Sequence, residues 1–325
     1  MLRSLSRQLK LAGIISLVRA APGDAISGYR DLTSFAADIG CPLIEVSSYE
    51  LAAEHDRLQL ERLNIDLLIV AGWQRLIPEW LIRRCNVGAI GAHGSADGIF
   101  GGRGRSPQNW ALIGDAKEFF LSIFWIDAGV DSGAIIDTSS FSLTPFDDIR
   151  TSYHKASLLT AQMIADAYAS GRLIKSNGTA QDQNGSYLPQ RLPQDGAIDW
   201  TRSSDEIYNF ARALTRPYPG AFSGLPRGGT IVVWRARPFD YACPRRCDPG
   251  EIVFVFDSGD LLVACGRGLL LLEDVEFRSG GHPPAIGDVL ASVDFRLQMQ
   301  EIIKRHRLKY PRLALSPRIT GLTGE

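Results

Sequence analysis

The sequence holds little cysteine, and its spacing is irregular. The five cysteines among 325 residues are odd in number and scattered, which is typical of reduced thiols rather than of a disulfide framework. Cys243 and Cys247 lie close together, but no second Cys/His pair follows at zinc-finger spacing, and a structural zinc site takes about four ligands. The sequence therefore predicts a reduced, cytoplasmic protein without a metal site.

Long apolar runs and an excess of one charge are also missing. A membrane-spanning helix needs roughly 20 apolar residues, whereas the run at 11–18 is interrupted at once by Arg19. The beginning of the chain can be read as a short signal peptide or as a helix followed by a buried strand, and we adopt the second interpretation. The net charge of −1 does not favour a dedicated nucleic-acid binder, and no membrane partner is expected.

Common catalytic signatures are absent as well. No GxGxxG motif opens a helix after a strand, and the glycine-rich GGRGR at 101–105 lacks the strand–turn–helix context of a dinucleotide or phosphate loop. No Gly-x-Ser-x-Gly elbow is present, so α/β-hydrolase chemistry has no candidate nucleophile.

What the first half does contain is an alternation of apolar strands and helical patterns. Strands are predicted at 12–18, 42–46, 66–73, 87–93, 119–127 and 133–139. Helices are predicted at 29–39, 49–63, 78–84 and 107–113, and a long helix with Thr144 as N-cap runs to about Ser170. Because continuously apolar strands suit a sheet covered on both faces, the pattern predicts a doubly wound α/β domain.

The second half differs in character. Ser203 and Glu206 form a capping-box pattern before a short helix at 205–214, and short strands separated by Gly and Pro turns follow, which is typical of a small β-barrel. The tail from Arg296 is helical and basic and is interpreted as a solvated surface helix. The expected division is a catalytic domain at 1–185, a linker at 186–202, a barrel domain at 203–295 and the tail at 296–325.

Two polar residues are the candidates for chemistry. His93 stands where the run VGAIGAH ends and a glycine-rich loop begins, and Asp131 lies between Gly129 and Gly133. In doubly wound sheets, sites form at the carboxyl ends of strands. A histidine beside a carboxylate is a workable proton-transfer pair, although each residue could also have a purely structural role, in a hydrogen-bonded strand end or an Asx-turn.

Three motifs, GAHGS, RGRSPQNWAL and GVDSG, follow one another along the chain. They match the pattern Asn-x-His, Arg-Gly-x-x-Pro and Gly-x-Asp-x-Gly, except that Gly91 stands in place of the asparagine. This pattern resembles the 10-formyltetrahydrofolate-dependent formyltransferases. The stretch DLLIVAGWQRLIPEWL at 66–81 resembles the segment lining that family's pterin pocket. LPQRLPQDGAIDW, ARALTRPYPGAFSGL and LLVACGRGLLLLE resemble its linker, its Pro-Gly-Ala turn and its OB-like C-terminal domain. The resemblance covers most of residues 9–295.

The resemblance implies transfer of a formyl group from 10-formyltetrahydrofolate to a primary amine. His93 would be the base or charged donor, and Asp131 would orient it. The residues expected at the folate are Trp73, Arg75, Leu76, Ile77 and Gly91. The residues expected at the acceptor are Arg103, Arg105, Ser106 and Pro107.

Three positions depart from the family pattern. Gly91 stands where the family has an asparagine that donates to the formyl oxygen, and loss of one such donor costs roughly 10²–10³ in rate. Ser95, Asn109 or a backbone N–H are the candidate replacements. The loop after the histidine, SADGIFGG, is changed, and the family's first strand is apparently missing because residues 1–11 already resemble its first helix.

Three functions follow as alternatives. The stretch after Arg103 is closest to the module that acts on UDP-aminoarabinose, which favours a small amine such as an amino sugar nucleotide. Methionyl-tRNA formyltransferase is the second, but the segment RAAPGDAISGYRD has only Arg19 and Arg30 as basic residues, which argues against tRNA because phosphate contacts dominate such binding. The third is a catalytically impaired relative that acts as a binding protein.

Overall fold

The computed structural model describes residues 1–18, 29–73, 75–174, 177–182, 184–242 and 246–323. Most of the segment RAAPGDAISGYRD, and Cys243, therefore lie outside the described residues. The chain divides into two compact units. The first comprises residues 1–103, 120–141 and 154–185, and the second comprises residues 104–119, 142–153 and 186–325.

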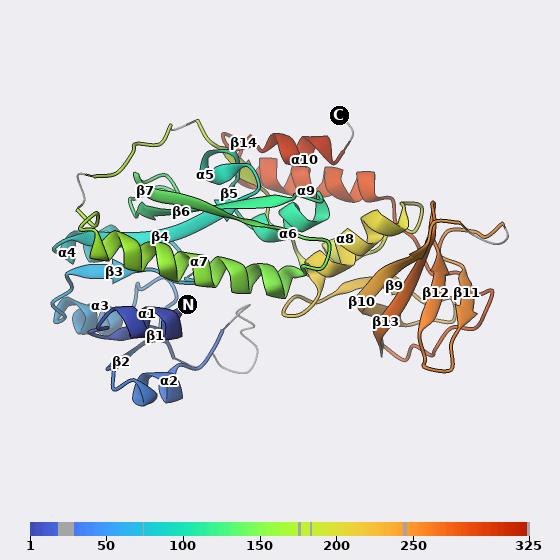
Figure 1. The fold of residues 1–325 in the computed structure, drawn as a ribbon, viewed down its shortest axis with the longest axis horizontal. Helices are drawn as coiled ribbons and strands as arrows, with labels where there is room; N and C mark the ends of the chain where they lie inside the picture. The colour runs from blue at the N-terminus through green and yellow to red at the C-terminus, as the bar shows by residue number, and fades with distance from the viewer. Residues whose placement is uncertain (19–28, 74, 175–176, 183, 243–245, 324–325) are drawn as a thin grey trace. The chain divides into compact units, whose positions relative to one another are not determined.

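The first unit is a mixed α/β structure with two sheets, whose elements are drawn from blue to lime in Figure 1. All six predicted strands are confirmed, as β1 (Ile14–Leu17), β2 (Leu43–Val46), β3 (Leu67–Ile69), β4 (Gly88–Ser95), β6 (Glu118–Trp125) and β7 (Ile135–Ser142). Strands β1 and β2 pair in parallel as a separate sheet, and the other four follow the order β3-β4-β6-β7. The expectation of one parallel sheet is thus corrected, because β6 runs antiparallel to β4.

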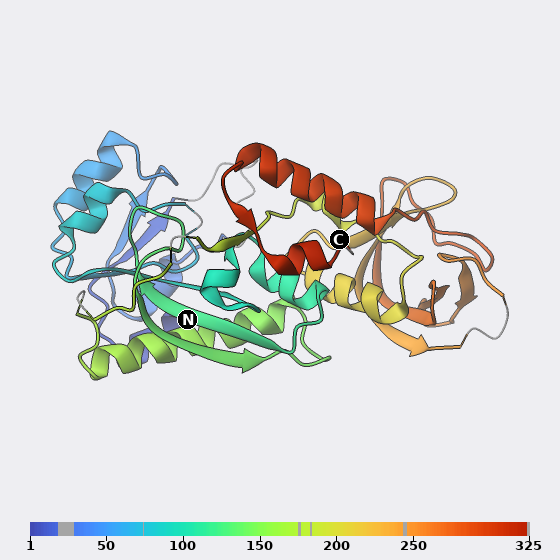
Figure 2. The ribbon, with the colours of Figure 1, turned by 90° about the horizontal axis from the view of Figure 1, so that it is seen from above.

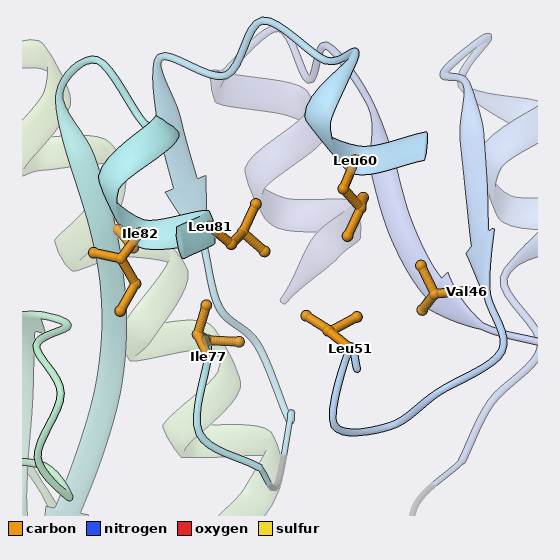
Figure 3. Close-up of a cluster of buried hydrophobic side chains, with 7 residues drawn as sticks. Val46, Leu51, Leu60, Ile77, Leu81 and Ile82 are labelled. Atoms are coloured by element: carbon orange, nitrogen blue, oxygen red, sulfur yellow. The ribbon is translucent and has the colours of Figure 1, made fainter. Parts of the chain in front are cut away.

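Helices accompany these strands along the chain. They are α1 (Leu2–Gln8), α2 (Thr33–Asp38), α3 (Glu54–Glu61), α4 (Glu79–Arg84), the short α5 (Gly98–Gly101) and α7 (Ile149–Ala169). Apolar side chains between α3, α4 and the strands form a core cluster, which Figure 3 shows around Leu60, Ile77 and Leu81. Burial of such side chains contributes about 1.5–3 kcal/mol each relative to exposure, so this cluster fixes the loops after β2 and β3.

The long helix α7 begins later than the sequence indicated. Thr144 is not its N-cap, since its backbone N–H and hydroxyl both donate to Asp147. Instead, the Asp148 backbone N–H donates to the Thr151 hydroxyl, and the Thr151 backbone N–H donates to the Asp148 carboxylate. This reciprocal pair satisfies N–H groups that a helix start leaves without partners.

The second unit begins with α6 (Pro107–Ile113) and contains α8 (Ser204–Leu214). The capping box before α8 is confirmed, because Ser203 accepts from the Glu206 N–H and Glu206 accepts from the Ser203 N–H. Burial by itself raises the pKa of Glu206, but hydrogen bonds from Ser203 and Arg202 outweigh it and lower this pKa to about 2. Short segments complete this part: β5 (Arg103–Gly104), β8 (Ser186–Leu188), β14 (Ala314–Leu315) and a 3₁₀ turn at Pro193–Gly196.

The remaining strands of this unit form one five-stranded sheet, drawn in yellow to orange in Figure 2. They are β9 (Ala221–Gly224), β10 (Thr230–Asp240), β11 (Ile252–Val255), β12 (Leu261–Ala264) and β13 (Leu269–Arg278). All pairings are antiparallel, in the order β11-β12-β13-β10-β9. The expected closed barrel is not confirmed, because within the described ranges no ladder joins β9 to β11.

The predicted basic tail forms α9 (Phe295–Lys309), followed by α10 (Pro317–Gly321). Asp294 caps α9 by accepting from the N–H groups of Arg296 and Leu297. In the part of the chain that is described, no helix combines the length and the hydropathy that crossing a bilayer requires.

Candidate active site

His93 lies within β4, which continues two residues beyond the strand end that the sequence predicted at His93. The strand continues to Ser95 because β6 pairs with it from Ile90 to Ser95, with His93 opposite Ser122 and Ser95 opposite Phe120. The residues after it also have regular structure, with α5 at Gly98–Gly101. The position of the His93 backbone is therefore set by a hydrogen-bonded ladder.

The structure brings His93 and Asp131 together. The His93 Nδ1 atom lies 3.4 Å from Asp131 Oδ2, and the two side chains are 11% and 23% exposed. The other ring nitrogen, Nε2, lies 2.8 Å from the Gly102 carbonyl oxygen. The pair is thus screened from bulk water without being sealed from it.

Both ring nitrogens of His93 face oxygen acceptors. A neutral imidazole carries one N–H and so can donate to only one of the two oxygens, whereas a protonated ring donates to both. The arrangement consequently stabilises the imidazolium that forms when His93 accepts a proton, which is the role a carboxylate partner has in general base catalysis.

A tight turn carries Asp131 to this position. Its backbone has φ +51°, in the left-handed region that Asp and Asn tolerate better than most residues. Within the turn, the Asp127 carboxylate accepts from the Gly129 N–H at 2.9 Å and from the Ser132 hydroxyl at 2.8 Å. The turn is closed by Gly133, where an added Cβ would lie 1.6 Å from the Trp125 carbonyl oxygen.

Gly133→Ala is expected to destabilise the protein by about 1–3 kcal/mol, the usual cost of overpacking a site that can only shift its backbone. The Trp125 carbonyl cannot move freely, because Trp125 is fixed in β6 opposite Ile90. The turn must move instead, so the His93–Asp131 contact should be lost as well. Urea unfolding measures the first effect and the formyl-transfer rate of the folded protein measures the second.

Gly321→Ala is the matched control for this substitution. An added Cβ at Gly321 has no neighbour within 4 Å, and its φ is not in the positive range, so its stability should stay the same or rise slightly. Equal stability of the Gly133 variant, the Gly321 variant and the wild type would contradict the steric role assigned to Gly133.

The five residues expected at the folate have different environments. Trp73 packs edge-on against Tyr49 with ring centroids 4.9 Å apart, and its buried Nε1 has no hydrogen-bond partner among the described residues. The Arg75 guanidinium lies 4.7 Å from the Tyr49 ring centroid. Its hydrogen bond to Glu50, 3.0 Å long, lowers the pKa of that carboxyl below its ordinary value.

The other three of these residues differ in exposure. Leu76 is 58% exposed, whereas Ile77 packs into the core cluster (Figure 3). Gly91 is buried in β4, and an added Cβ there would meet the Ile126 side chain at 3.3 Å. Residues 91 and 93 share one face of the strand because side chains alternate along it.

The residues expected at the acceptor belong to both units. Arg103 is only 1% exposed, and its guanidinium donates to Gln181 and to the Asp182 carbonyl. That buried position corrects the expectation of an acceptor contact for Arg103. Arg105, Ser106 and Pro107 begin the second unit, where Pro107 is the first residue of α6. Ser106 has φ +58°, and its hydroxyl accepts from the Arg191 N–H at 3.3 Å.

The two candidates for the missing oxyanion donor have structural partners. The Ser95 side chain is fully buried, and its hydroxyl donates to the Gly98 carbonyl at 2.7 Å. Asn109 is 1% exposed and lies in the second unit, where its amide donates to the Ala213 carbonyl at 2.7 Å. The Ser95 hydroxyl has one proton, which it donates to Gly98, so the suggestion that Ser95 is the oxyanion donor is corrected. The hydrogen bond of Asn109 joins α6 to α8.

Asn109→Ala is therefore expected to lower the free energy of unfolding by about 1–3 kcal/mol, since the buried Ala213 carbonyl loses its donor. The rate of formyl transfer per folded molecule should stay within about twofold, well below the loss that removal of an oxyanion donor causes. Urea titration measures the effect on stability, and kcat measures the effect on the rate of formyl transfer. A kcat that falls a hundredfold at unchanged stability would restore Asn109 to the catalytic site.

Gln181 is a contact of the site that the sequence did not reveal. Its side-chain amide donates to the backbone carbonyls of Asp131 and Gly133. It lies 50 residues from Asp131, in a polar stretch after the long helix for which the sequence predicted no helix or strand. Within the described ranges, no group of His, Cys, Asp and Glu side chains is arranged to hold a metal ion.

Two family models match the chain. The model described as "Formyl transferase" matches residues 28–167, which include β4 and the Asp131 turn. The model described as "Formyl transferase, C-terminal domain" matches residues 192–285, which include α8 and the five-stranded sheet. The first of these matches includes both His93 and Asp131.

Solved structures with a similar fold include HypX from Aquifex aeolicus in complex with tetrahydrofolic acid, at TM-score 0.60 and 15% identity. The match covers 90% of this chain and 47% of the HypX chain, so this chain spans about half the length of HypX. Methionyl-tRNA formyltransferase from Clostridium thermocellum matches at TM-score 0.55 and 16% identity, over 83% of this chain and all (100%) of that chain.

Curated relatives are similar in sequence as well. The methionyl-tRNA formyltransferase of Nitrosomonas eutropha is 30% identical over 257 residues, which are 79% of this chain and 78% of that protein. The corresponding protein of Geobacter metallireducens is 29% identical over 245 residues, 74% of each chain. Two family models in sequence order and a relative at this identity lead to one conclusion: the chain belongs to the formyl transferase family.

Proposed function

We propose that the chain is an N-formyltransferase that uses 10-formyltetrahydrofolate and formylates a primary amine of a small molecule, such as an amino sugar nucleotide. The observation that carries the proposal is the contact of His93 with Asp131 and with the Gly102 carbonyl. That contact supplies a base together with the groups that stabilise its protonated form, which formylation of an amine requires.

The loop after β3 has features that suit a folate. The buried Nε1 of Trp73 lacks a partner among the described residues, and a buried donor of this kind is costly unless a ligand or water satisfies it. The nearby Tyr49 ring and Arg75 add a stacked aromatic and cationic surface. HypX was solved with tetrahydrofolic acid, and a Helicobacter canadensis N-formyltransferase with folinic acid. Trp73 and Arg75 would hold the donor, which supplies the formyl group when bound.

The residues of this chain manage the proton of the amine. As the amine nitrogen forms its bond to the formyl carbon, the bond from that carbon to the folate nitrogen breaks, and that nitrogen takes up a proton as it leaves. The amine must lose a proton, and His93 accepts it. The Asp131 carboxylate and the Gly102 carbonyl then each receive a hydrogen bond from the protonated ring. Because the pair is largely screened from water, these interactions are stronger than they would be in bulk solvent.

Charge supports a small acceptor. The segment at 19–31 contains two arginines and two aspartates and so has no net positive charge to attract a polynucleotide backbone. The H. canadensis N-formyltransferase, solved with dTDP-3-aminofucose, has a similar fold at TM-score 0.51 and 15% identity, over 79% of this chain and 88% of that one. We propose Arg105, Ser106 and Pro107 as the residues that contact the acceptor.

Methionyl-tRNA is the second candidate acceptor. The curated relatives at 29–30% identity are named methionyl-tRNA formyltransferases. In addition, α9 exposes Arg296, Lys304, Arg307 and Lys309, a set of cations of the kind that contacts phosphates.

The test is a formylation assay with purified full-length protein and 10-formyltetrahydrofolate. Nucleotide-linked amino sugars and methionyl initiator tRNA are compared under the same conditions, and the formylated product is detected by mass spectrometry. The small-amine proposal predicts the higher kcat/KM for an amino sugar nucleotide. A higher value for the tRNA would establish the second candidate, and tetrahydrofolate binding without turnover of any amine would show a binding protein.

A further inference from the structure

A buried arginine is joined to the turn that carries Asp131. The Arg103 guanidinium donates from Nη2 to Gln181 Oε1 at 2.9 Å and to the Asp182 carbonyl at 2.8 Å. Gly185 packs directly on this group, because an added Cβ there would lie 2.7 Å from the guanidinium carbon. A buried arginine is costly unless it is hydrogen-bonded, so this contact joins Arg103 to Gln181 and Asp182.

Gln181 also contacts the turn that carries Asp131. Its Nε2 donates to the Asp131 carbonyl at 3.1 Å and to the Gly133 carbonyl at 2.6 Å. All four hydrogen bonds of the bridge lie within one compact unit. The turn residue with the left-handed backbone, Asp131, is thereby held from outside its own loop.

The backbone of the segment fixes where Gln181 lies. Thr179 and Ile135 exchange two backbone hydrogen bonds of 2.8 Å, at the beginning of β7. Gln181 is two residues further along and is half-buried. Its amide is consequently presented to the turn by a paired backbone.

The same bridge reaches the other partner of His93. Arg103 directly follows Gly102, whose carbonyl lies 2.8 Å from His93 Nε2. The residues that contact the two ring nitrogens, Asp131 and Gly102, are therefore joined to each other through Gln181 and Arg103.

We propose that Gln181 and Arg103 are positioning residues that hold Asp131 and Gly102 at their distances from His93. This inference rests on the proposed function for its kinetic consequence. A displacement of about 1 Å costs up to about 10²-fold in rate, and a site is only as well placed as the residues that support it.

Gln181→Glu isolates the donor groups of this bridge. The variant keeps an oxygen acceptor for Arg103 but presents a second oxygen to the carbonyls of Asp131 and Gly133. We expect kcat to fall by about 10- to 10²-fold, while the KM for 10-formyltetrahydrofolate stays within about twofold. Gln162→Glu is the matched control, because Gln162 is an exposed residue of α7 whose amide donates only to Asp166 in the described structure, and its kcat should be unchanged.

A double-mutant cycle distinguishes positioning from a general loss of fold. Asp131→Asn keeps a side chain that tolerates the left-handed backbone but removes the carboxylate. If Gln181 acts through that carboxylate, Gln181→Glu should cost less than about threefold in the Asp131→Asn background, since contacting residues are not additive. Equal costs in both backgrounds would overturn the proposal.

A second readout does not depend on activity. The ¹⁵N chemical shifts of the His93 ring report which nitrogens carry protons, and we expect them to change in the Gln181→Glu variant and not in the Gln162→Glu variant. Unchanged His93 shifts would overturn the positioning role even if formyl transfer were detected. If the His93 shifts change in the Gln181→Glu variant although the wild type formylates no amine, the positioning role of Gln181 stands and the proposed function is rejected.

Discussion

His93→Ala is expected to lower kcat for formyl transfer by about 10²–10⁴-fold, the contribution of a positioned general base. The substitution removes the side chain whose two ring nitrogens face Asp131 and the Gly102 carbonyl. Binding of the donor should change little, because the loop of Trp73 and Arg75 is held by its own contacts with Tyr49. The measurement is kcat under saturating donor and acceptor, with the KM for each.

His154→Ala serves as the control for this prediction. His154 is an exposed residue of α7 and takes no part in the site, so its kcat should equal that of the wild type. Melting temperatures should be similar for both variants, because His93 packs at the edge of the site rather than in the core cluster. A His93→Ala protein that keeps more than about a tenth of the wild-type kcat would contradict its role as the base.

Gly91→Asn is expected to raise kcat, by about tenfold and at most about 10²-fold. Loss of an oxyanion donor costs roughly 10²–10³, and restoring one without its supporting contacts recovers only a part. The new side chain would stand on the His93 face of β4, two residues away. Its Cβ would meet the Ile126 side chain at 3.3 Å and Phe124 at 3.5 Å, so a shift of a few tenths of an ångström at the flexible end of Ile126 accommodates it.

Gly91→Ala separates the effect of the amide from that of the added carbon. Both variants introduce the same contact with Ile126, but only the asparagine brings a donor. The prediction is that Gly91→Ala has a kcat equal to or below that of the wild type. If both variants change kcat equally, the donor at this position is not what limits the reaction, and a backbone N–H must fill that role.

Local patterns in the sequence were sufficient for most elements. The apolar run at 87–93 predicts β4, and Ser203 with Glu206 predicts the beginning of α8, because both depend on neighbouring residues. The His93–Asp131 pair could be predicted because His93 lies near the end of β4 and Asp131 in the turn between β6 and β7, which are neighbouring strands of the same sheet. The glycines around Asp131 indicated a tight turn, and the contact of Gly133 with the Trp125 carbonyl explains it.

Features that depend on distant partners could not be predicted. Gly94 and Ser95 have low strand propensity, and they extend β4 only because β6 pairs with them. The side chains of Arg103 and Asn109 are polar and appeared suited to a ligand. Their partners, Gln181 and Ala213, are 78 and 104 residues away, and no local signal identifies them. The barrel expectation failed similarly, because strand propensity does not determine whether a sheet closes.

The two partners of the central pair are anchored in different ways, and this has a kinetic consequence. The backbone of His93 can leave its place only when the ladder between β4 and β6 opens, which is a rare, cooperative event in a folded protein. The Asp131 turn is instead held by a few local hydrogen bonds, among them the two from Gln181, and such contacts open more readily than a strand ladder. The lifetime of the contact between His93 and Asp131 is therefore expected to depend on the turn and not on the strand.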